Sequence, residues 1–168
     1  MISTKAFTLP LLLLASCVSF APPTGVEPAP SVSRVLGLVN EARARPRRCG
    51  GERHAAVPPL AQSAILDRVA VAHAREMAAR GRMSHSGADG STPGERAIRA
   101  GYRWQAIGEN VAYGQPTSEQ VVAGWLGSAH HCANIMDPDY TDMGIGFAAG
   151  ARDAAVLYWS QVFGKPAP

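Results

Sequence analysis

The first sixteen residues constrain this chain most, because they decide the compartment in which it folds. Lys5 is followed by a short apolar run, residues 6–14, and then by small residues and Cys17. This order is typical of a secretory signal. The run is about half as long as the roughly 20 apolar residues that a membrane-spanning helix needs, and it contains Pro10. We therefore predict that residues 1–16 direct export and that the rest of the chain folds outside the cytoplasm.

The residues around Cys17 predict a lipid anchor. Residues 14–17, Leu-Ala-Ser-Cys, resemble the lipobox of bacterial lipoproteins, in which cleavage precedes the cysteine and the thiol carries a diacylglyceryl group. Cleavage after Ala21 is the alternative, but it would place Pro22 directly after the cut, which is a poor substrate geometry. We expect Cys17 to hold the protein on a membrane in the cell envelope. The alternative is a soluble secreted or periplasmic protein.

The cysteine count agrees with this assignment. Three cysteines in an exported chain leave one odd thiol. If Cys17 carries the lipid, Cys49 and Cys132 remain, and an oxidising compartment is expected to pair them. The alternative is two buried free thiols.

Composition excludes several classes of protein. Apolar residues make up 46% of the chain and charged residues 17%, so neither a disordered protein nor a polytopic membrane protein is expected. The net charge is +3, but most arginines alternate with acids, so no cationic stripe is available for a phosphate backbone. We expect no nucleic-acid partner. The one basic cluster, residues 43–48, is interpreted as a solvated helix end.

Sequence patterns divide the chain into a proline-rich tether, residues 17–31, and one domain, residues 32–165. Apolar periodicity and N-terminal capping patterns at Thr92 and Thr117 predict helices, and glycine-bounded apolar runs predict strands. The expected helices are 32–46, 63–80, 92–101 and 117–129; the expected strands are 107–114 and a late hairpin, 143–148 with 155–163. The predicted class is α+β, with helices packed on a small antiparallel sheet.

Three polar residues stand out as candidates for chemistry. His85 opens a glycine-rich loop after a helix, a favoured place for function. Glu109 is the odd carboxylate in an apolar stretch and requires polar partners if it is buried. His131 follows the helix that contains Trp125. His73, on the apolar face of its helix, is interpreted as structural.

The chain resembles the CAP superfamily, the SCP-like extracellular family of cysteine-rich secretory, antigen 5 and pathogenesis-related proteins, in its bacterial form. The resemblance rests on ordered motifs: His-Ser at 85–86, Gly-Glu-Asn-Val-Ala at 108–112, residues 125–136, Met-Gly-Ile-Gly at 143–146 and residues 158–164. It implies a three-layer α-β-α sandwich with a cleft lined by two histidines and, in many members, two glutamates.

Matched by motif, His85 and His131 take the places of the two histidines and Glu109 that of one glutamate. Ser128 stands where the second glutamate would be. We also place Asn110 and Asn134 at the cleft, as side chains that pin local backbone.

Two imidazoles and a carboxylate are suited to Zn²⁺ or another divalent cation. Glu109 would then be a third ligand beside His85 and His131, or a general base on a metal-bound water. The alternative is a polar cleft without metal, in which Glu109 accepts hydrogen bonds from both histidines. We favour a binding module for a metal and a small apolar or peptidic ligand. The alternative function is a metal-dependent hydrolase of peptides or esters with Glu109 as general base.

Overall fold

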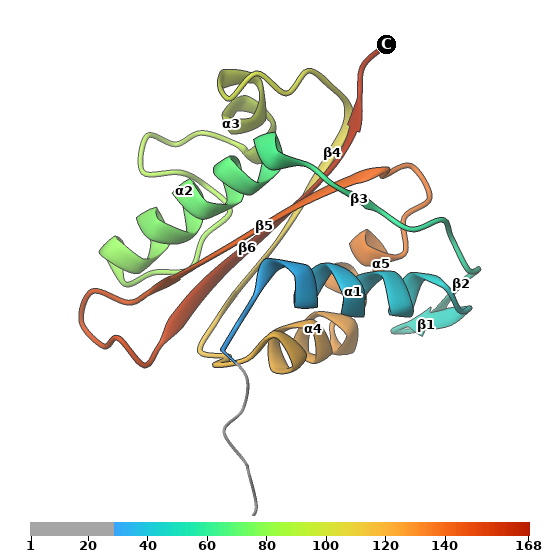
Figure 1. Ribbon diagram of the computed structural model, residues 1–168, viewed down its shortest axis with the longest axis horizontal. Helices are drawn as coiled ribbons and strands as arrows, with labels where there is room; N and C mark the ends of the chain where they lie inside the picture. Colours follow the sequence, from blue (N-terminus) through green and yellow to red (C-terminus); the bar gives the residue numbers. More distant parts are fainter. Residues whose placement is uncertain (1–28) are drawn as a thin grey trace, which may run out of the picture.

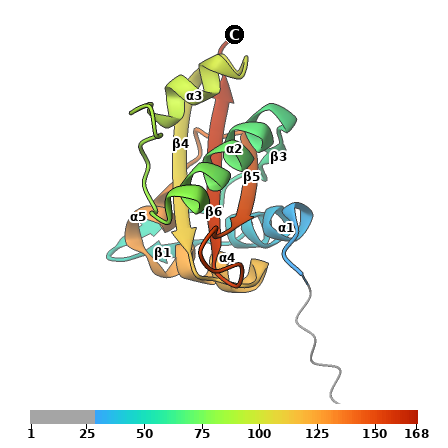
Figure 2. The same cartoon turned by 90° about the vertical axis from the view of Figure 1, so that its left-hand side faces the viewer.

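The computed structural model describes residues 29–168, which form three layers. A four-stranded sheet lies in the middle, with strand order β3-β5-β6-β4. Helices α2 (Ala64–Arg80) and α3 (Pro93–Arg99) cover one face, and α1 (Val32–Arg43), α4 (Ser118–Gly127) and α5 (Ala129–Ile135) cover the other (Figures 1 and 2). The expected α-β-α sandwich is confirmed. The predicted signal, the anchor at Cys17 and most of the tether lie outside the described residues.

The sheet is built on the predicted hairpin. Strands β5 (Asp142–Ala149) and β6 (Leu157–Pro166) pair antiparallel, and β4 (Trp104–Tyr113) pairs antiparallel with β6. Strand β4 starts three residues before the predicted boundary at 107, across a register irregularity between Trp104 and Ala106. The two-residue strand β3 (Ala61–Gln62), parallel to β5, was not predicted, because so short a pairing leaves no periodic pattern.

A small hairpin, residues 47–54, is not among the expected strands. Strands β1 (Arg47–Cys49) and β2 (Glu52–His54) pair antiparallel around Gly50, whose φ of 60° suits glycine. A disulfide joins Cys49 to Cys132 of α5, as predicted. It closes a separation of 83 residues. In the chain-entropy model such a loop contributes about 4–5 kcal/mol.

The helix starts follow their capping residues. Ser31, Ser63, Thr92 and Thr117 each accept a hydrogen bond from a backbone N–H three residues later. At Thr92 the reciprocal bond from its backbone N–H to Glu95 completes the predicted capping box.

The helix predicted for residues 117–129 is in fact two helices. The helical conformation is interrupted at Ser128, which adopts an extended conformation, and α5 begins at the next residue. His131 therefore lies in the first turns of a separate helix rather than at the end of the one that contains Trp125. The break was not apparent from the sequence because residues 118–135 contain no proline.

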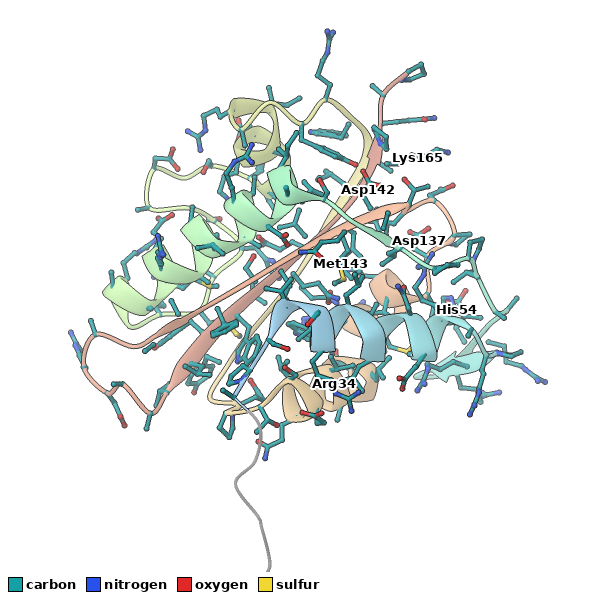
Figure 3. The ribbon with its side chains drawn as sticks, viewed as in Figure 1. Arg34, His54, Asp137, Asp142, Met143 and Lys165 are labelled. Carbon is teal, nitrogen blue, oxygen red and sulfur yellow. A yellow bond between two sulfur atoms is a disulfide. The ribbon has the colours of Figure 1, made fainter. Side chains whose placement is uncertain are left out.

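Successive side chains of β6 point to opposite faces of the sheet and so belong to two separate cores. Trp159 and Phe163 pack with α1, α4 and α5, together with Met143 near the centre of Figure 3. Val162 packs under α2 and α3 on the opposite face. Helix α2 lies directly on Gly144, where a Cβ atom would collide with the backbone of Leu66. The glycine thus lets the helix approach the sheet closely.

Arg43 corrects the interpretation of residues 43–48 as a solvated helix end. Its side chain is fully buried and donates to backbone carbonyl oxygens of Pro58 (2.7 Å), Ile135 (2.6 Å), Asp137 (3.0 Å) and Tyr140 (3.3 Å). Burial lowers the pKa of the guanidinium from its ordinary value. Arg43 therefore ties two connecting segments to the end of α1.

Within residues 29–168, no helix has both the length and the apolar character that crossing a membrane requires.

Candidate functional site

Glu109 lies at the centre of a buried polar cluster on the α2 side of the sheet. It comes from β4, and its side chain is 1% exposed. One carboxylate oxygen, Oε2, accepts from Arg96 Nη2 at 2.6 Å and from Ser160 Oγ at 3.4 Å. The other, Oε1, lies 2.9 Å from His85 Nδ1. Both oxygens of Glu109 are therefore occupied by protein partners.

His85 is the exposed member of this cluster. It comes from the loop between α2 and α3, and 57% of its side chain is exposed. The hydrogen bond to Glu109 is the main reason why its pKa is raised, and burial and the charge of Arg96 oppose that effect. Because Nδ1 donates to the carboxylate, Nε2 is the ring nitrogen left for a ligand.

The loop that carries His85 is held by two side chains, one from each of the neighbouring helices. Arg96 Nη1 donates to the carbonyl oxygens of His85 (3.0 Å) and Ser91 (2.7 Å). The Nε2 atom of His73, on α2, lies 2.7 Å from the carbonyl oxygen of Ser84. This nitrogen therefore carries the ring hydrogen and donates it. The loop that presents His85 is thereby attached to both helices of this layer. The buried position of His73, 1% exposed, agrees with its interpretation as structural.

His131 is positioned by two asparagines that link α5 to β4. Asn110 Nδ2 donates to the carbonyl oxygen of His131 (3.2 Å) and to Gln161 Oε1 (3.0 Å). Asn134 Nδ2 donates to Asn110 Oδ1 (2.9 Å) and to the Glu109 carbonyl oxygen (3.3 Å). Both asparagines thus join regular elements, whereas loop backbone was expected. They hold the helix of His131 against the strand of Glu109.

The imidazole of His131 is half-buried. Burial lowers its pKa, and the charges of His85 and His130 lower it further. At neutral pH this environment favours the uncharged form of His131.

An apolar pocket of about 290 Å³ adjoins His131. Met83, Tyr113 and Trp125 contribute apolar surface, and Ser128 and His131 also line the pocket. Met83 and Tyr113 are 43% and 56% exposed, although both are large apolar side chains. The side chain of Ser128 makes no capping hydrogen bond to the backbone of α5, so its hydroxyl group is not used to cap that helix.

Residues 36–163 match the model of the family described as CAP: Cysteine-rich secretory protein family. The chain belongs to the CAP family. The Bacillus subtilis protein YkwD is 29% identical over 107 residues, which are 64% of this chain and 40% of YkwD. The chain thus spans about two-fifths of that relative's length.

Two solved structures share the CAP fold. An extracellular protein with an SCP domain from Bacillus anthracis superposes with a TM-score of 0.66 at 25% identity, covering 80% of this chain and 40% of that one. An outer surface protein from Borrelia burgdorferi superposes with a TM-score of 0.63 at 19% identity, covering 80% of this chain and 89% of that one.

A divalent cation at this site would have at most the two imidazoles of His85 and His131 as ligands. Among residues 29–168, no group of three or more His, Cys, Asp or Glu side chains is arranged to hold a metal ion. Glu109 does not fit as a ligand, because Arg96 and His85 already occupy its oxygens. It does fit the role of a carboxylate that orients a metal-binding histidine.

Sequence reasoning missed Arg96, which is the strongest partner of Glu109. The capping box at Thr92, which predicts the start of α3, could have indicated Arg96 as a candidate partner. Once that box fixes the helix start, Arg96 is the basic residue that follows the capping Glu95. Ser160 of β6 was also missed, although its pairing with Val111 places it beside β4.

Proposed function

We propose that this CAP domain is a binding module for a small molecule that has an apolar body and a hydroxyl group. The observation that carries the proposal is the apolar pocket beside His131. Its volume of about 290 Å³ is close to the lower limit for small-molecule sites. The exposed apolar side chains of Met83 and Tyr113 would be covered by such a ligand.

Two polar side chains that line this pocket, those of Gln115 and Ser128, favour a ligand with a hydroxyl group. Gln115 Oε1 is buried and has no hydrogen-bond partner among the described residues, and Gln115 lines the pocket. A ligand hydroxyl can donate to that oxygen and accept from Ser128. The indole of Trp125 uses its Nε1 to donate to the Val111 carbonyl oxygen at 3.4 Å, so it offers the ligand only apolar surface.

The geometry of Glu109 favours binding over hydrolysis. A general base needs a carboxylate oxygen within reach of the water that it activates. The Glu109 side chain is 1% exposed, and both its oxygens are hydrogen-bonded to Arg96, Ser160 and His85. Glu109 therefore acts here as a structural anchor that orients His85.

Titration of the full chain with 1-octanol, followed by two-dimensional NMR, tests the pocket. We expect saturable shifts of the Trp125 indole and of the residues around Ser128. Gly124→Leu should abolish them, because Gly124 lines the pocket and its position is open enough for a side chain to enter. Gly127→Leu, on the same helix and outside the pocket, is the control and should bind normally. Unsaturable shifts, or normal binding by Gly124→Leu, would overturn the proposal.

The hydrogen bond between Glu109 and His85 favours a second candidate function, binding of a divalent cation. His85 Nε2 and the neutral imidazole of His131 would hold the ion, which would supply a Lewis acid at the rim of the pocket. Calorimetric titration with Zn²⁺ should show one-to-one binding that His85→Ala and His131→Ala both remove. His130→Ala is the control, because His130 is exposed beside His131. Binding that survives both variants would reject this site.

We further propose that the protein is exported and attached to a membrane through lipid on Cys17. The extracellular and outer-surface descriptions of the two structural neighbours support export, and the Cys49–Cys132 disulfide agrees with an oxidising compartment. Cys17→Ser should release the protein from the membrane fraction. Unchanged membrane association of this variant would contradict the anchor.

A further inference from the structure

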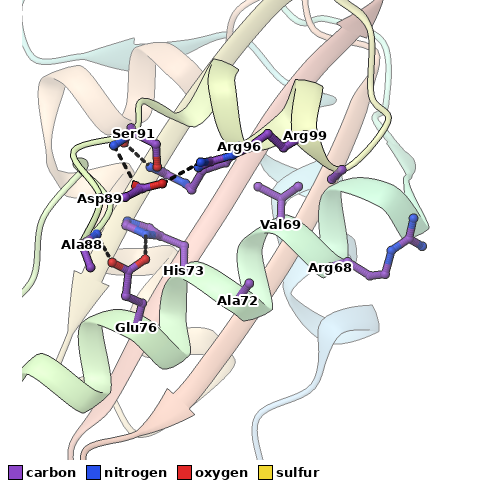
Figure 4. A pocket seen from close by; sticks show the side chains of 11 residues that line it. Arg68, Val69, Ala72, His73, Glu76, Ala88, Asp89, Ser91, Arg96 and Arg99 are labelled. Atoms are coloured by element: carbon purple, nitrogen blue, oxygen red, sulfur yellow. Dashed lines mark hydrogen bonds and ion pairs between the residues drawn. The ribbon is translucent and has the colours of Figure 1, made fainter.

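The acidic groups between α2 and α3 are compensated within the domain. In the hollow shown in Figure 4, Glu76 lies 3.8 Å from His73 and accepts a hydrogen bond from the backbone N–H of Ala88. Asp89, on the opposite wall, lies 2.6 Å from Arg99. The acids of this hollow therefore already have partners in the protein.

The β1–β2 hairpin, on the other side of the sheet, carries charge that is not compensated. Residues 44–54 contain four arginines and one glutamate, a net charge of +3, which equals that of the whole chain. No ion pair within residues 29–168 involves any of these arginines. Side chains that end in nitrogen extend outward from this edge of the domain (Figure 3). We refer to the four residues as the arginine patch: Arg45, Arg47, Arg48 and Arg53.

The register of the hairpin places two of these arginines directly opposite each other. Arg48 is paired with Arg53 across the strands, and the next residue, Cys49, is bonded to Cys132 of α5. Because successive side chains of a strand point to opposite faces, Arg48 and Arg53 point away from α5, and both are exposed. Like charges directly opposite each other destabilise a hairpin. A bound anion would remove this repulsion.

The chemistry of the patch suits phosphate next to apolar material. A guanidinium group binds two phosphate oxygens through parallel N–H donors, and Arg48 uses only Nη2 in its recorded bond to the Gly51 carbonyl oxygen, at 2.7 Å. Arg45 and Arg47 line a groove of about 500 Å³ between α1 and α4, which is also lined by Leu38 and Leu126. Phosphate groups beside apolar chains are what the surface of a phospholipid bilayer presents.

The position of the patch brings it within reach of a membrane that holds Cys17. Ser31, which precedes α1, donates from its backbone N–H to Ser118 Oγ at 3.1 Å, so the chain enters the domain in the layer of α1 and α4. The hairpin lies in the same layer, beyond the far end of α1 (Figures 1 and 2). Helix α1 is about 18 Å long. The chain from Cys17 to residue 29 spans at most about 40 Å, which is more than that length.

We propose that the arginine patch docks this layer of the domain on anionic phospholipid headgroups. The choice of a membrane as the partner rests on the proposed attachment through Cys17. The lipid on Cys17 confines the domain to the membrane surface, and the patch determines which layer of the domain faces it. Confinement raises the effective concentration of headgroups, so a contact that is weak by itself becomes significant.

Sedimentation with lipid vesicles tests the patch in the full chain that carries Cys17→Ser, which leaves no thiol at residue 17 for a lipid. We expect tighter binding to vesicles of phosphatidylglycerol and phosphatidylcholine than to phosphatidylcholine alone, and weaker binding at higher salt. Adding Arg48→Gln and Arg53→Gln should weaken binding to the anionic vesicles roughly tenfold or more. Equal binding before and after these substitutions would overturn the proposal.

A matched control separates the patch from the net charge of the protein. Arg75→Gln with Arg82→Gln removes the same charge from exposed positions on the α2 side, and it should leave binding within about twofold of the parent. A loss equal to that of the hairpin variant would overturn the proposal. Residues 6–14 are identical in all these proteins, so their affinity for lipid cancels in the comparison. The lipid on Cys17 is tested separately, by the release of Cys17→Ser from the membrane fraction.

Two further measurements distinguish the partner and the role of the patch. A short DNA duplex that binds through Arg48 and Arg53 more tightly than the anionic vesicles would assign the patch to nucleic acid and overturn membrane docking. In the free protein, Arg53→Gln should keep or raise the melting temperature, because it removes the repulsion from Arg48. A lower melting temperature would give Arg53 a structural role in the hairpin and overturn the proposal.

Discussion

Arg96 Nη2 lies 2.6 Å from Glu109 Oε2, and the two side chains are 9% and 1% exposed. The same guanidinium also holds the carbonyl oxygens of His85 and Ser91. One buried ion pair thus fixes α3, β4 and the loop of His85 relative to one another. Removal of either partner takes from the other buried charge its main electrostatic compensation.

We predict that Arg96→Met lowers the free energy of unfolding by about 3–5 kcal/mol, because the buried Glu109 loses its arginine and keeps only His85 and Ser160 as partners. Urea denaturation measures the loss. The matched control is Arg99→Met, on the same helix. Arg99 also lies 2.6 Å from a carboxylate, that of Asp89, but both side chains are more than half exposed. Solvent screening should make its loss far smaller. Equal effects of the two substitutions would show that burial does not strengthen the Arg96 pair.

His85 should titrate above the ordinary histidine pKa of 6.5, because its hydrogen bond to Glu109 favours the charged ring. NMR titration of the ring protons measures this pKa, and Glu109→Gln should lower it. A raised folded-state pKa means that the stabilisation is complete below about pH 6.5 and is lost as pH rises through the folded value. The stability difference between the wild type and His85→Ala should therefore shrink on going from pH 5.5 to pH 8. A constant difference would contradict the linkage.

His131 should titrate below its ordinary pKa, mainly through burial and then through the charges of His85 and His130. In His85→Ala the pKa of His131 should rise but stay below 6.5, because burial remains. The same NMR titration measures it. An unchanged value in His85→Ala would show that the two imidazoles do not face a common region.

Arg43→Met should destabilise the domain by about 3 kcal/mol. It removes hydrogen bonds to four buried or partly buried carbonyl oxygens, and each acceptor left unsatisfied carries a penalty. Thermal unfolding followed by circular dichroism measures the loss. Arg45→Met, two residues away and exposed, should be nearly neutral. A neutral Arg43→Met would mean that water replaces the guanidinium at these carbonyls.

Two glycine substitutions should act in opposite directions. Gly144→Ala should lower the melting temperature strongly, because the added Cβ meets the backbone of Leu66 and Asp67 in α2 and pushes the helix off the sheet. Gly37→Ala, in the middle of α1 where a Cβ meets nothing within 4 Å, should stabilise the protein by about 0.5–1 kcal/mol. A tolerated Gly144→Ala would show that α2 can shift on β5 at little cost.

The elements that were predicted well carry strong local patterns. The capping box at Thr92 and the apolar periodicity of α2 fix where helices begin, and the apolar run at β6 indicates a buried strand. The break at Ser128 was missed because it depends on the packing of α5, through Cys132 and Ile135, against the core. The two-residue strand β3 was missed because its pairing with β5 is parallel and remote in sequence.

The sequence by itself determined the α+β class, the resemblance that implied an α-β-α sandwich, and the disulfide, since helix caps, motif order and cysteine positions are read along the chain; it also named His85, Glu109 and His131 as candidates. Only the tertiary structure decided the role of Glu109. Arg96 lies thirteen residues earlier in the chain, and Ser160 comes from another strand. Which of them reaches the carboxylate depends on how α3 and β6 pack beside β4. No local pattern encodes such long-range contacts, because they arise from the mutual burial of elements that are distant in sequence.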